Sequence, residues 1–498
     1  MAESLLQVLL QFQPEAPEVK QKRDYDQAAR NFSAQVSNIS SSHWQKGADT
    51  SSDVLTVLDP TTNSIAYAFA LRHRIAGIVE KRNVPDTLKP GGALWNKLVK
   101  FLEEFDSVQM RYAGHEWRKL VDYVEQIARV MGSPGLAIAP IRSAMTRLDP
   151  TTGTFTHMHL RFMELCMETR SYNAAQEILD NYIHSIPTKI PQHVREGLEY
   201  SVPCADVATS GEYIHVASGH SEKVTLSDLQ EYYLLGAMAY LGLKQFRKAQ
   251  QMLEHVLVVP TANTANGFML EAYKKWVLVS CLVHSTDRAI PRTANTVAIK
   301  QVKSASKAYE ALAEAHAQLS NLSKLKVQIK YGAEIWADDG NTGLVNEVLV
   351  SQMRSYVSRL SRTFSAIPVS NIANNLGETP DNIAQYLENM IKEGHLNARL
   401  EQSDKPNTGA VLRFFLDPSQ GPLAKTEKQQ QQVLFEQTLR TNMLAEQVKD
   451  ASYRLTLTKE YVENLKRVNK KQATGGEAMD TAWDDGIDAE EDIMDDMH

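Results

Sequence analysis

Two segments of this sequence, residues 160–183 and 234–257, repeat one pattern of side chains at a shift of 74 residues. The shift superposes three pairs of similar residues: Tyr172 on Phe246, Ala175 on Ala249 and Leu179 on Leu253. Two periods of about 37 residues would give this shift, and such a period is typical of tetratricopeptide-like helix-turn-helix repeats. One repeat cannot bury its apolar face alone, so copies must stack. We therefore expect a helical-repeat array over residues 151–340.

The second copy indicates how such a repeat would pack. Ala249 would let two helices approach closely, and the ring of Phe246 would fill the space beside it. Pro260 would then end the second helix, because proline lacks the backbone N–H that a helix needs. The same pattern also fits two amphipathic hairpins in any all-α protein, and it leaves that alternative open.

Residues 1–150 are predicted to hold N-terminal helices. Two segments have apolar residues at steps of three and four, which is typical of helices with one buried face. They contain Leu94, Leu98, Leu102 and Phe105, and then Trp117, Leu120, Val121, Val124 and Ile127. Residues 13–60, after a short first helix, are rich in Ser, Asn and Gln without a sustained period. We expect this stretch to be a loosely ordered polar connection.

The pattern changes after the array. The expected elements are a helix (345–362), a short strand, helices at 370–376 and from Thr379 and Pro380, and strands at 396–400 and 410–416. Proline is favoured at the first helical position, and alternating apolar residues indicate the strands. Helix, strand, helix, helix, strand, loop, strand is the order of a winged helix, which we expect over residues 345–420.

The last two predicted strands would form a hairpin with an exposed edge. Backbone N–H and C=O groups on such an edge can pair with a strand of another protein. The residues expected to meet a partner there are Leu396, Ala398, Leu400, Val411 and Arg413.

A long C-terminal helix is predicted over residues 425–471. Its apolar side chains alternate steps of four and three and form a narrow seam, as in a coiled coil. The seam consists of Leu444, Val448, Ala451, Leu455, Thr458, Val462 and Leu465. A seam this narrow cannot fold alone, so we expect partner helices to cover its larger apolar residues.

The net charge of −7 is unevenly distributed. Residues 475–498 contain ten Asp or Glu and no Lys or Arg, which leaves +3 on the rest of the chain. We expect residues 472–498 to form an acidic, disordered tail. Large apolar residues are interleaved with these acids: Trp483, Ile487, Ile493 and Met494. The tail therefore suits either a solubilising end or a segment that docks on a basic surface.

Nucleic acid is not an expected partner. The predicted third helix of the winged helix carries Asp381, Glu388 and Glu393 against Lys392, and phosphates would be repelled by this face. The sequence also lacks a concentrated basic patch.

Cysteine usage and hydropathy bear on the compartment. The chain has three cysteines, Cys166, Cys204 and Cys281, which are widely spaced and exclude a disulfide framework. No stretch approaches the roughly 20 apolar residues of a membrane span. We expect a protein of the cytoplasm and nucleus without a membrane partner.

These features resemble the PCI family, named after the proteasome lid, the COP9 signalosome and translation initiation factor 3. In that family a helical-repeat array leads into a winged helix, and the PCI domain would cover roughly residues 225–420 here. The segments that are most similar to the COP9 signalosome subunit 3 group are 232–260, 268–282, which contains Glu271-Ala-Tyr-Lys-Lys275, and 383–396.

The resemblance implies a non-catalytic scaffold subunit of the complex that removes a ubiquitin-like modifier from cullins. Its implied partners are other PCI-type subunits, joined through winged-helix edges and C-terminal helices, and the part of the complex that contains the catalytic metalloprotease. Three alternatives remain open: a regulatory subunit of the proteasome lid, a translation initiation factor subunit, and a winged-helix nucleic-acid-binding protein.

One histidine pair resembles part of the zinc motif of that family's catalytic subunit. His157 and His159 match its two histidines, but Met167 and Arg170 stand where the motif has Ser and Asp. A cation in place of a carboxylate ligand would repel Zn²⁺. No phosphate-binding glycine loop or nucleophile elbow is present either. We expect no enzymatic activity, no cofactor and no small-molecule substrate.

Overall fold

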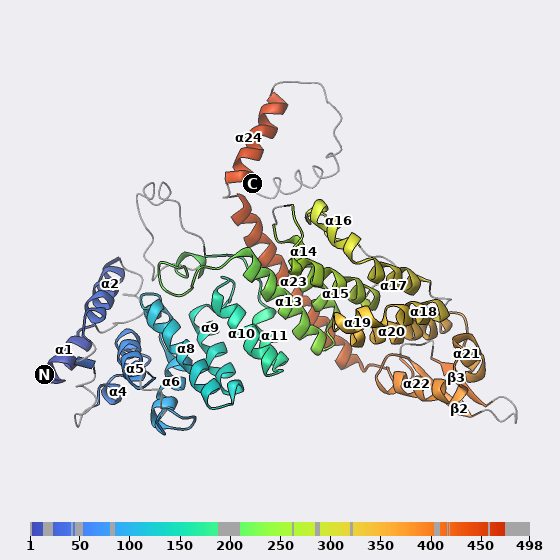
Figure 1. Ribbon diagram of the computed structural model, residues 1–498, viewed down its shortest axis with the longest axis horizontal. Coiled ribbons are helices and arrows are strands. Elements are labelled where there is room, and N and C mark those ends of the chain that lie inside the picture. Colours follow the sequence, from blue (N-terminus) through green and yellow to red (C-terminus); the bar gives the residue numbers. More distant parts are fainter. Residues whose placement is uncertain are drawn as a thin grey trace. The chain divides into compact units, whose positions relative to one another are not determined.

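The computed structural model describes residues 2–12, 23–40, 43–44, 53–79, 85–187, 210–260, 263–283, 289–318, 322–402, 409–415, 417, 419–456 and 459–473. The chain divides into two compact units, residues 1–416 and 417–498. In the first unit, helices follow one another to a small sheet near its C-terminal end (Figure 1).

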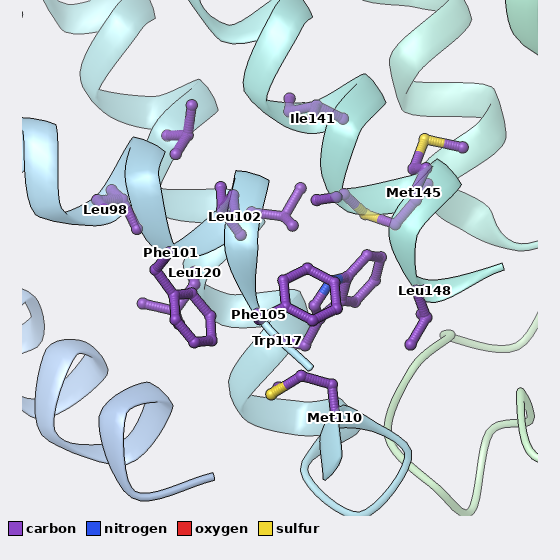
Figure 2. Packing of buried hydrophobic residues seen from close by; sticks show 14 of the residues in the cluster. Leu98, Phe101, Leu102, Phe105, Met110, Trp117, Leu120, Ile141, Met145 and Leu148 are labelled. Atoms are coloured by element: carbon purple, nitrogen blue, oxygen red, sulfur yellow. The ribbon is translucent and has the colours of Figure 1, made fainter. Parts of the chain in front are cut away.

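The N-terminal region is helical. Its described elements are α1 (Ala2–Leu9), α2 (Arg23–Ser37), α4 (Val54–Val57), α5 (Ser64–Val79), α6 (Ala93–Glu104), α7 (Ser107–Met110), α8 (Gly114–Val130), η2 (Pro134–Ala137) and α9 (Ile138–Leu148). Every residue of the two predicted apolar stripes is buried, which confirms both. Figure 2 shows Leu102 of α6, Trp117 of α8 and Met145 of α9 packed in one core.

The prediction of a loosely ordered connection over 13–60 is wrong for α2. Four side chains at steps of four, three and four are buried along this helix: Tyr25, Ala29, Phe32 and Val36. The helix packs against α5, and Oγ of Ser33 donates to the carbonyl of Tyr112 at 2.9 Å. Only one side chain per helical turn is buried, and Asn, Gln and Ser are frequent at the other positions of the helix. The polar composition therefore concealed the helical period in the sequence. Residues 13–22, 41–42, 45–52 lie outside the described part.

The predicted repeat is present in the backbone. Its helices are α10 (His157–Glu168) and α11 (Tyr172–Leu179), and α13 (Leu226–Gly242) and α14 (Phe246–Val258). Arg170 and Lys244, which are 74 residues apart, both have φ of 56° in the turns between the paired helices. The following N–H donates five residues back in each turn, at 2.8 Å in the first and 2.9 Å in the second. Both copies thus close with the same turn.

The two hairpins are neighbours in the array, so the interpretation of the shift as two equal periods is wrong. Helix α13 packs directly against α10 and α11. The contact is close: a Cβ added at Gly236 would lie 2.7 Å from Cδ2 of Leu179, and one at Gly242 would lie 2.7 Å from Cδ2 of Tyr172. The shift therefore contains one repeat step and the inserted segment before α13, of which residues 188–209 are not described.

The array continues with α15 (Gly267–Val283), α16 (Thr296–Ala305), α17 (Lys307–Ala317), α18 (Leu322–Tyr331), α19 (Ala333–Asp338) and α20 (Thr342–Leu360). Helix α15 packs against α14, α17 and α20. Its buried residues include Tyr273 and Trp276, whose rings stack at 5.9 Å between centroids. The core thus runs on from the hairpins to α20.

A winged helix follows, in the predicted order. Its elements are β1 (Ala366–Pro368), α21 (Val369–Leu376), α22 (Pro380–Lys392), β2 (Ala398–Gln402) and β3 (Ala410–Phe414). Gly377 ends α21 with φ of 65°, and Pro380 is the first residue of α22. Ile383 and Leu387 are buried as expected, whereas Met390 is buried in place of the half-buried Ile391. The expected mainly α fold, with a repeat array and a winged helix, is confirmed.

The second unit contains α23 (Glu427–Thr456) and α24 (Lys459–Ala473). A single helix over 425–471 was expected, and the described residues of this range from Glu427 onward are helical. Residues 457 and 458, including the predicted seam residue Thr458, are outside the described part, as is the acidic tail from residue 474.

Candidate partner-binding surfaces

The winged-helix sheet has the strand order β1-β3-β2, with both pairs antiparallel. Ala398 pairs with Phe414, and Leu400 pairs with Leu412. Side chains alternate between the two faces of a strand, and those of Ala398, Leu412 and Phe414 are buried in the winged-helix core. The two edges of the described sheet are therefore β1 and β2.

The predicted hairpin residues do not all lie at an edge. Val411 and Arg413 belong to β3, which is paired on both sides, so their assignment to the edge is wrong. The strand order depends on β1, which lies about 45 residues before β3 in the sequence and pairs with it. Leu396 lies just before β2, and its side chain is buried in the core.

Strand β2 is the better candidate for pairing with a partner strand. It holds Ala398 and Leu400 and has a neighbour on one side only within the described sheet. Strand β1 is shorter, and Pro368 at its end has no backbone N–H to donate. The wing, residues 403–408, lies outside the described residues.

The exposed face of this hairpin carries a small charge network. Arg399 and Arg413 are register partners on neighbouring strands, where two like charges would repel each other. Glu401 lies between them, because it pairs with Arg399 and accepts from Nε of Arg413 at 3.1 Å. The guanidinium of Arg399 also lies 5.7 Å from the ring centroid of Phe415.

The face of α22 that would meet DNA in a nucleic-acid-binding winged helix is acidic. Asp381, Glu388 and Glu393 are exposed, and Nζ of Lys392 lies 3.1 Å from a carboxylate oxygen of Glu388. Lys392 is thus already paired with an acid, and a phosphate that approached this face would meet net negative charge.

The predicted seam is exposed along α23. The exposed fractions are 51% for Leu444, 66% for Val448 and 54% for Leu455. On α24, Val462 is exposed and Leu465 is half-buried. Exposed apolar stripes of this length are unusual on the surface of a protein that works alone.

Helix α23 has a second apolar stripe that the sequence analysis missed. Phe435, Leu439 and Met443 follow at steps of four and are exposed, with 64% of Phe435 accessible. Phe435 stands nine residues before Leu444, which is two and a half helical turns, so the two side chains point to opposite sides. The steps of four between these three residues are visible in the sequence and could have predicted the second stripe. Helix α23 therefore offers apolar contacts on more than one side.

The histidine pair lies at the start of α10, and Nδ1 of His157 and both ring nitrogens of His159 form hydrogen bonds within the protein. Nδ1 of His157 accepts from the backbone N–H of Glu222 at 3.1 Å. His159 accepts from the N–H of Thr156 and donates to the carbonyl of Thr152, each at 3.1 Å. Burial lowers the pKa of both histidines to about 4. Arg170 lies in the turn after α10.

The described residues contain no group of three or more His, Cys, Asp or Glu side chains arranged to hold a metal ion. None of their helices combines the length and the hydropathy needed to cross a bilayer.

A buried polar network holds α15 to the turn before α20. Nζ of Lys275 donates to Oδ1 of Asn341 at 2.8 Å, and Asn341 donates to the hydroxyl of Tyr309 at 2.9 Å. Asp339 accepts from Tyr309 at 2.7 Å and from Lys274 at 2.6 Å. Because α20 leads into the winged helix, this network fixes the helix from which the winged helix continues. Nothing in the local sequence indicates these pairings.

Comparisons with known proteins agree with this architecture. A family model described as "COP9 signalosome complex subunit 3, N-terminal helical repeats" matches residues 27–298. A model of the PCI domain matches residues 329–405. The first match covers most of α2, the later N-terminal helices and the repeat hairpins, and the second covers most of the winged helix.

Three curated relatives carry the name COP9 signalosome complex subunit 3. The protein from Emericella nidulans is 32% identical over 459 residues, which is 89% of each chain. Those from Arabidopsis thaliana and Neurospora crassa are 25% and 22% identical and cover 74% and 84% of this chain, and 74% and 82% of their own. The resemblance inferred from the sequence is confirmed, and the chain belongs to the COP9 signalosome subunit 3 family.

Proposed function

We propose that the chain is a non-catalytic scaffold subunit of the COP9 signalosome, and that it supports assembly of the complex that removes a ubiquitin-like modifier from cullins. The observation that supports the proposal is that α23, in a chain of this family, exposes apolar stripes on opposite sides. A helix with this distribution is stable against water only when other helices cover it.

Two surfaces would join the chain to its partners. The β2 edge would pair with a strand from a neighbouring PCI-type subunit, since backbone groups on an edge strand accept any strand of suitable length. Helices α23 and α24 would enter a bundle with helices of several subunits, including the part that contains the metalloprotease. The seam residues Leu444, Val448, Leu455, Val462 and Leu465 and the stripe around Leu439 would be buried there.

The absence of catalysis is part of this proposal. Nδ1 of His157 and both ring nitrogens of His159 form hydrogen bonds within the protein, and Arg170 replaces the carboxylate that a zinc site needs. The proposed compartments are the cytoplasm and the nucleus.

Affinity purification tests the proposal. A tag at the N-terminus leaves α23 and α24 unaltered, and mass spectrometry should find the other signalosome subunits in near-equal amounts. Depleting the chain should leave cullins hyper-modified, because the complex fails to assemble. Recovery of proteasome lid subunits or small ribosomal subunits in place of signalosome subunits would contradict it.

A further inference from the structure

A small cavity lies among three segments of the first unit: helix α8, the turn between α9 and α10 with the start of α10, and the inserted segment before α13. Its volume is about 20 Å³. A cavity needs roughly 10–15 Å³ to hold one water molecule, so this one has room for a single water and for no larger ligand. Its polar lining is buried and includes Trp117, Asp149, Thr152, Thr154, His159 and His220.

Trp117 brings a hydrogen-bond donor to this cavity. Only 2% of the residue is accessible, and Nε1 is buried without an acceptor among the residues that the structure describes. A buried donor is costly unless something accepts from it, and nearly all of them therefore have a partner. Two other buried tryptophans of the array are paired in this way. Nε1 of Trp276 donates to Oε1 of Glu254 at 3.1 Å, and Nε1 of Trp336 donates to the carbonyl of Ile329 at 3.0 Å.

The turn before α10 brings oxygen atoms to the same cavity. Oγ1 of Thr152 accepts from Nδ2 of Asn181 at 2.9 Å, and Oγ1 of Thr154 pairs with Oγ of Ser210 at 2.7 Å. A hydroxyl has one donor and two acceptor lone pairs, so both threonines retain capacity for a further hydrogen bond. The carboxylate of Asp149 is a third oxygen-bearing group of this lining.

A water molecule fits this lining better than an ion does. A cation would face the indole N–H of Trp117, and an anion would face the carboxylate of Asp149. His159 and His220 add no positive charge near pH 7, because burial lowers the pKa of each to about 4. Water can accept from the indole and donate to oxygen atoms at the same time, and a buried water typically forms such bonds with two to four polar groups.

We propose that this cavity binds one structural water molecule, which accepts from Nε1 of Trp117 and donates to oxygen atoms of the turn over residues 149–154. The water would join α8 to the turn that precedes α10. Because His220 also lines the cavity, the site lies where the inserted segment packs against these two elements. None of the surfaces proposed for assembly includes it.

Nuclear magnetic resonance of the full chain, labelled with ¹⁵N at tryptophan, tests the site. An indole N–H in contact with a long-lived water shows a cross-relaxation peak at the water frequency. Trp117 should show this peak. Trp276 and Trp336, which donate to protein oxygen atoms, are the matched controls and should not show it. Trp117→Phe identifies the signal and should remove it. A Trp117 signal without the peak, or the same peak at all three tryptophans, would overturn the proposal.

A crystal structure of the unaltered full chain tests the same site without any substitution. It should contain one ordered water whose oxygen lies about 2.7–3.2 Å from Nε1 of Trp117 and within the same reach of an oxygen of the 149–154 turn. A dry cavity, or an indole that donates to a protein oxygen instead, would overturn the proposal. A metal ion surrounded by oxygen ligands at this place would overturn it as well.

Discussion

Nζ of Lys275 donates a hydrogen bond to Oδ1 of Asn341 at 2.8 Å, across 66 residues of sequence, and both side chains are buried. Asn341→Ala would remove an acceptor from the lysine and a donor from Tyr309. Lys275 keeps Glu271 as a partner and Tyr309 keeps Asp339, so the loss is that of two buried hydrogen bonds. We expect the free energy of unfolding to fall by about 1–3 kcal/mol. Urea unfolding measures it.

The control for this variant is Asn389→Ala. Asn389 is an exposed residue of α22, and its replacement should change the free energy of unfolding by less than about 0.5 kcal/mol. Equal losses in the two variants would show that the Lys275 to Asn341 bond does not stabilise the fold.

Charged substitutions on α23 should leave the free chain folded but prevent its incorporation into the complex. Leu455→Asp and Leu439→Asp alter opposite stripes of exposed residues, so the circular dichroism spectrum of the isolated chain should not change. In an affinity purification, each should reduce the recovery of partner subunits about tenfold or more, because a buried carboxylate without a partner costs several kcal/mol. Ser452→Asp adds the same charge without removing an apolar side chain and should assemble normally. Normal assembly of Leu439→Asp alone would limit the contact to the seam.

Glu401→Gln should destabilise the winged helix in a salt-dependent way. The change leaves Arg399 opposite Arg413 without the carboxylate between them. For exposed pairs we expect a loss of about 0.5–1 kcal/mol at low salt, which 1 M salt should largely remove. Adding Arg399→Gln should restore stability, because it removes the repulsion. Thermal unfolding at two salt concentrations measures both effects.

Acid should destabilise the repeat array near α10. Burial lowers the pKa of His159 and of His220 to about 4. In the unfolded chain both would titrate near 6.5, so between these values the unfolded chain binds more protons and falling pH favours it. Each histidine should cost about 2 kcal/mol between pH 6.5 and pH 5.

Urea unfolding at pH 7, 6 and 5 checks this dependence. His220→Gln should have a shallower dependence on pH than the unaltered chain, whatever its stability at pH 7. His395→Gln changes an exposed side chain and should leave the slope as it is. An identical slope for His220→Gln would refute the role of this residue.

Gly114→Ala should destabilise the chain, although Gly114 lies in helix α8 and alanine is normally more stable than glycine in a helix. A Cβ there would lie 2.5 Å from the carbonyl oxygen of Ser218 and from Nδ1 of His220. Overpacking of this kind costs about 1–3 kcal/mol, more than the gain in helix propensity. Gly343→Ala in α20 meets no atom within 4 Å and should stabilise by about 0.5–1 kcal/mol. Opposite signs of the two changes in urea unfolding are therefore expected.

Local periodicity predicted much of this fold. The stripe of Leu98 and Leu102 and the repeated pair Ala175 and Ala249 depend on spacing along one helix or one hairpin, and all four side chains are buried. Helix α2 was missed because Tyr25 and its three buried companions form a stripe too narrow to stand out among polar neighbours.

Features that depend on distant segments could not be predicted in the same way. The central place of β3, with Val411 and Arg413, depends on pairing with β1, and no residue of the hairpin encodes it. The hydrogen bond between Lys275 and Asn341 joins segments that only the folded array brings together. On α23 the seam residues Leu444, Val448 and Leu455 are exposed, and their contact with partner helices stays a prediction. The stripe around Leu439 was missed because only one seam was predicted on this helix.

The stripes of α23 also bear on the chain before assembly. A newly synthesised copy that has not met its partners presents Leu444 and Phe435 to water on opposite sides of one helix. Chaperones and proteases act on surfaces of this kind, so an unassembled copy should have a short half-life. The cellular amount of this protein should then follow the supply of its partners more closely than its own rate of synthesis.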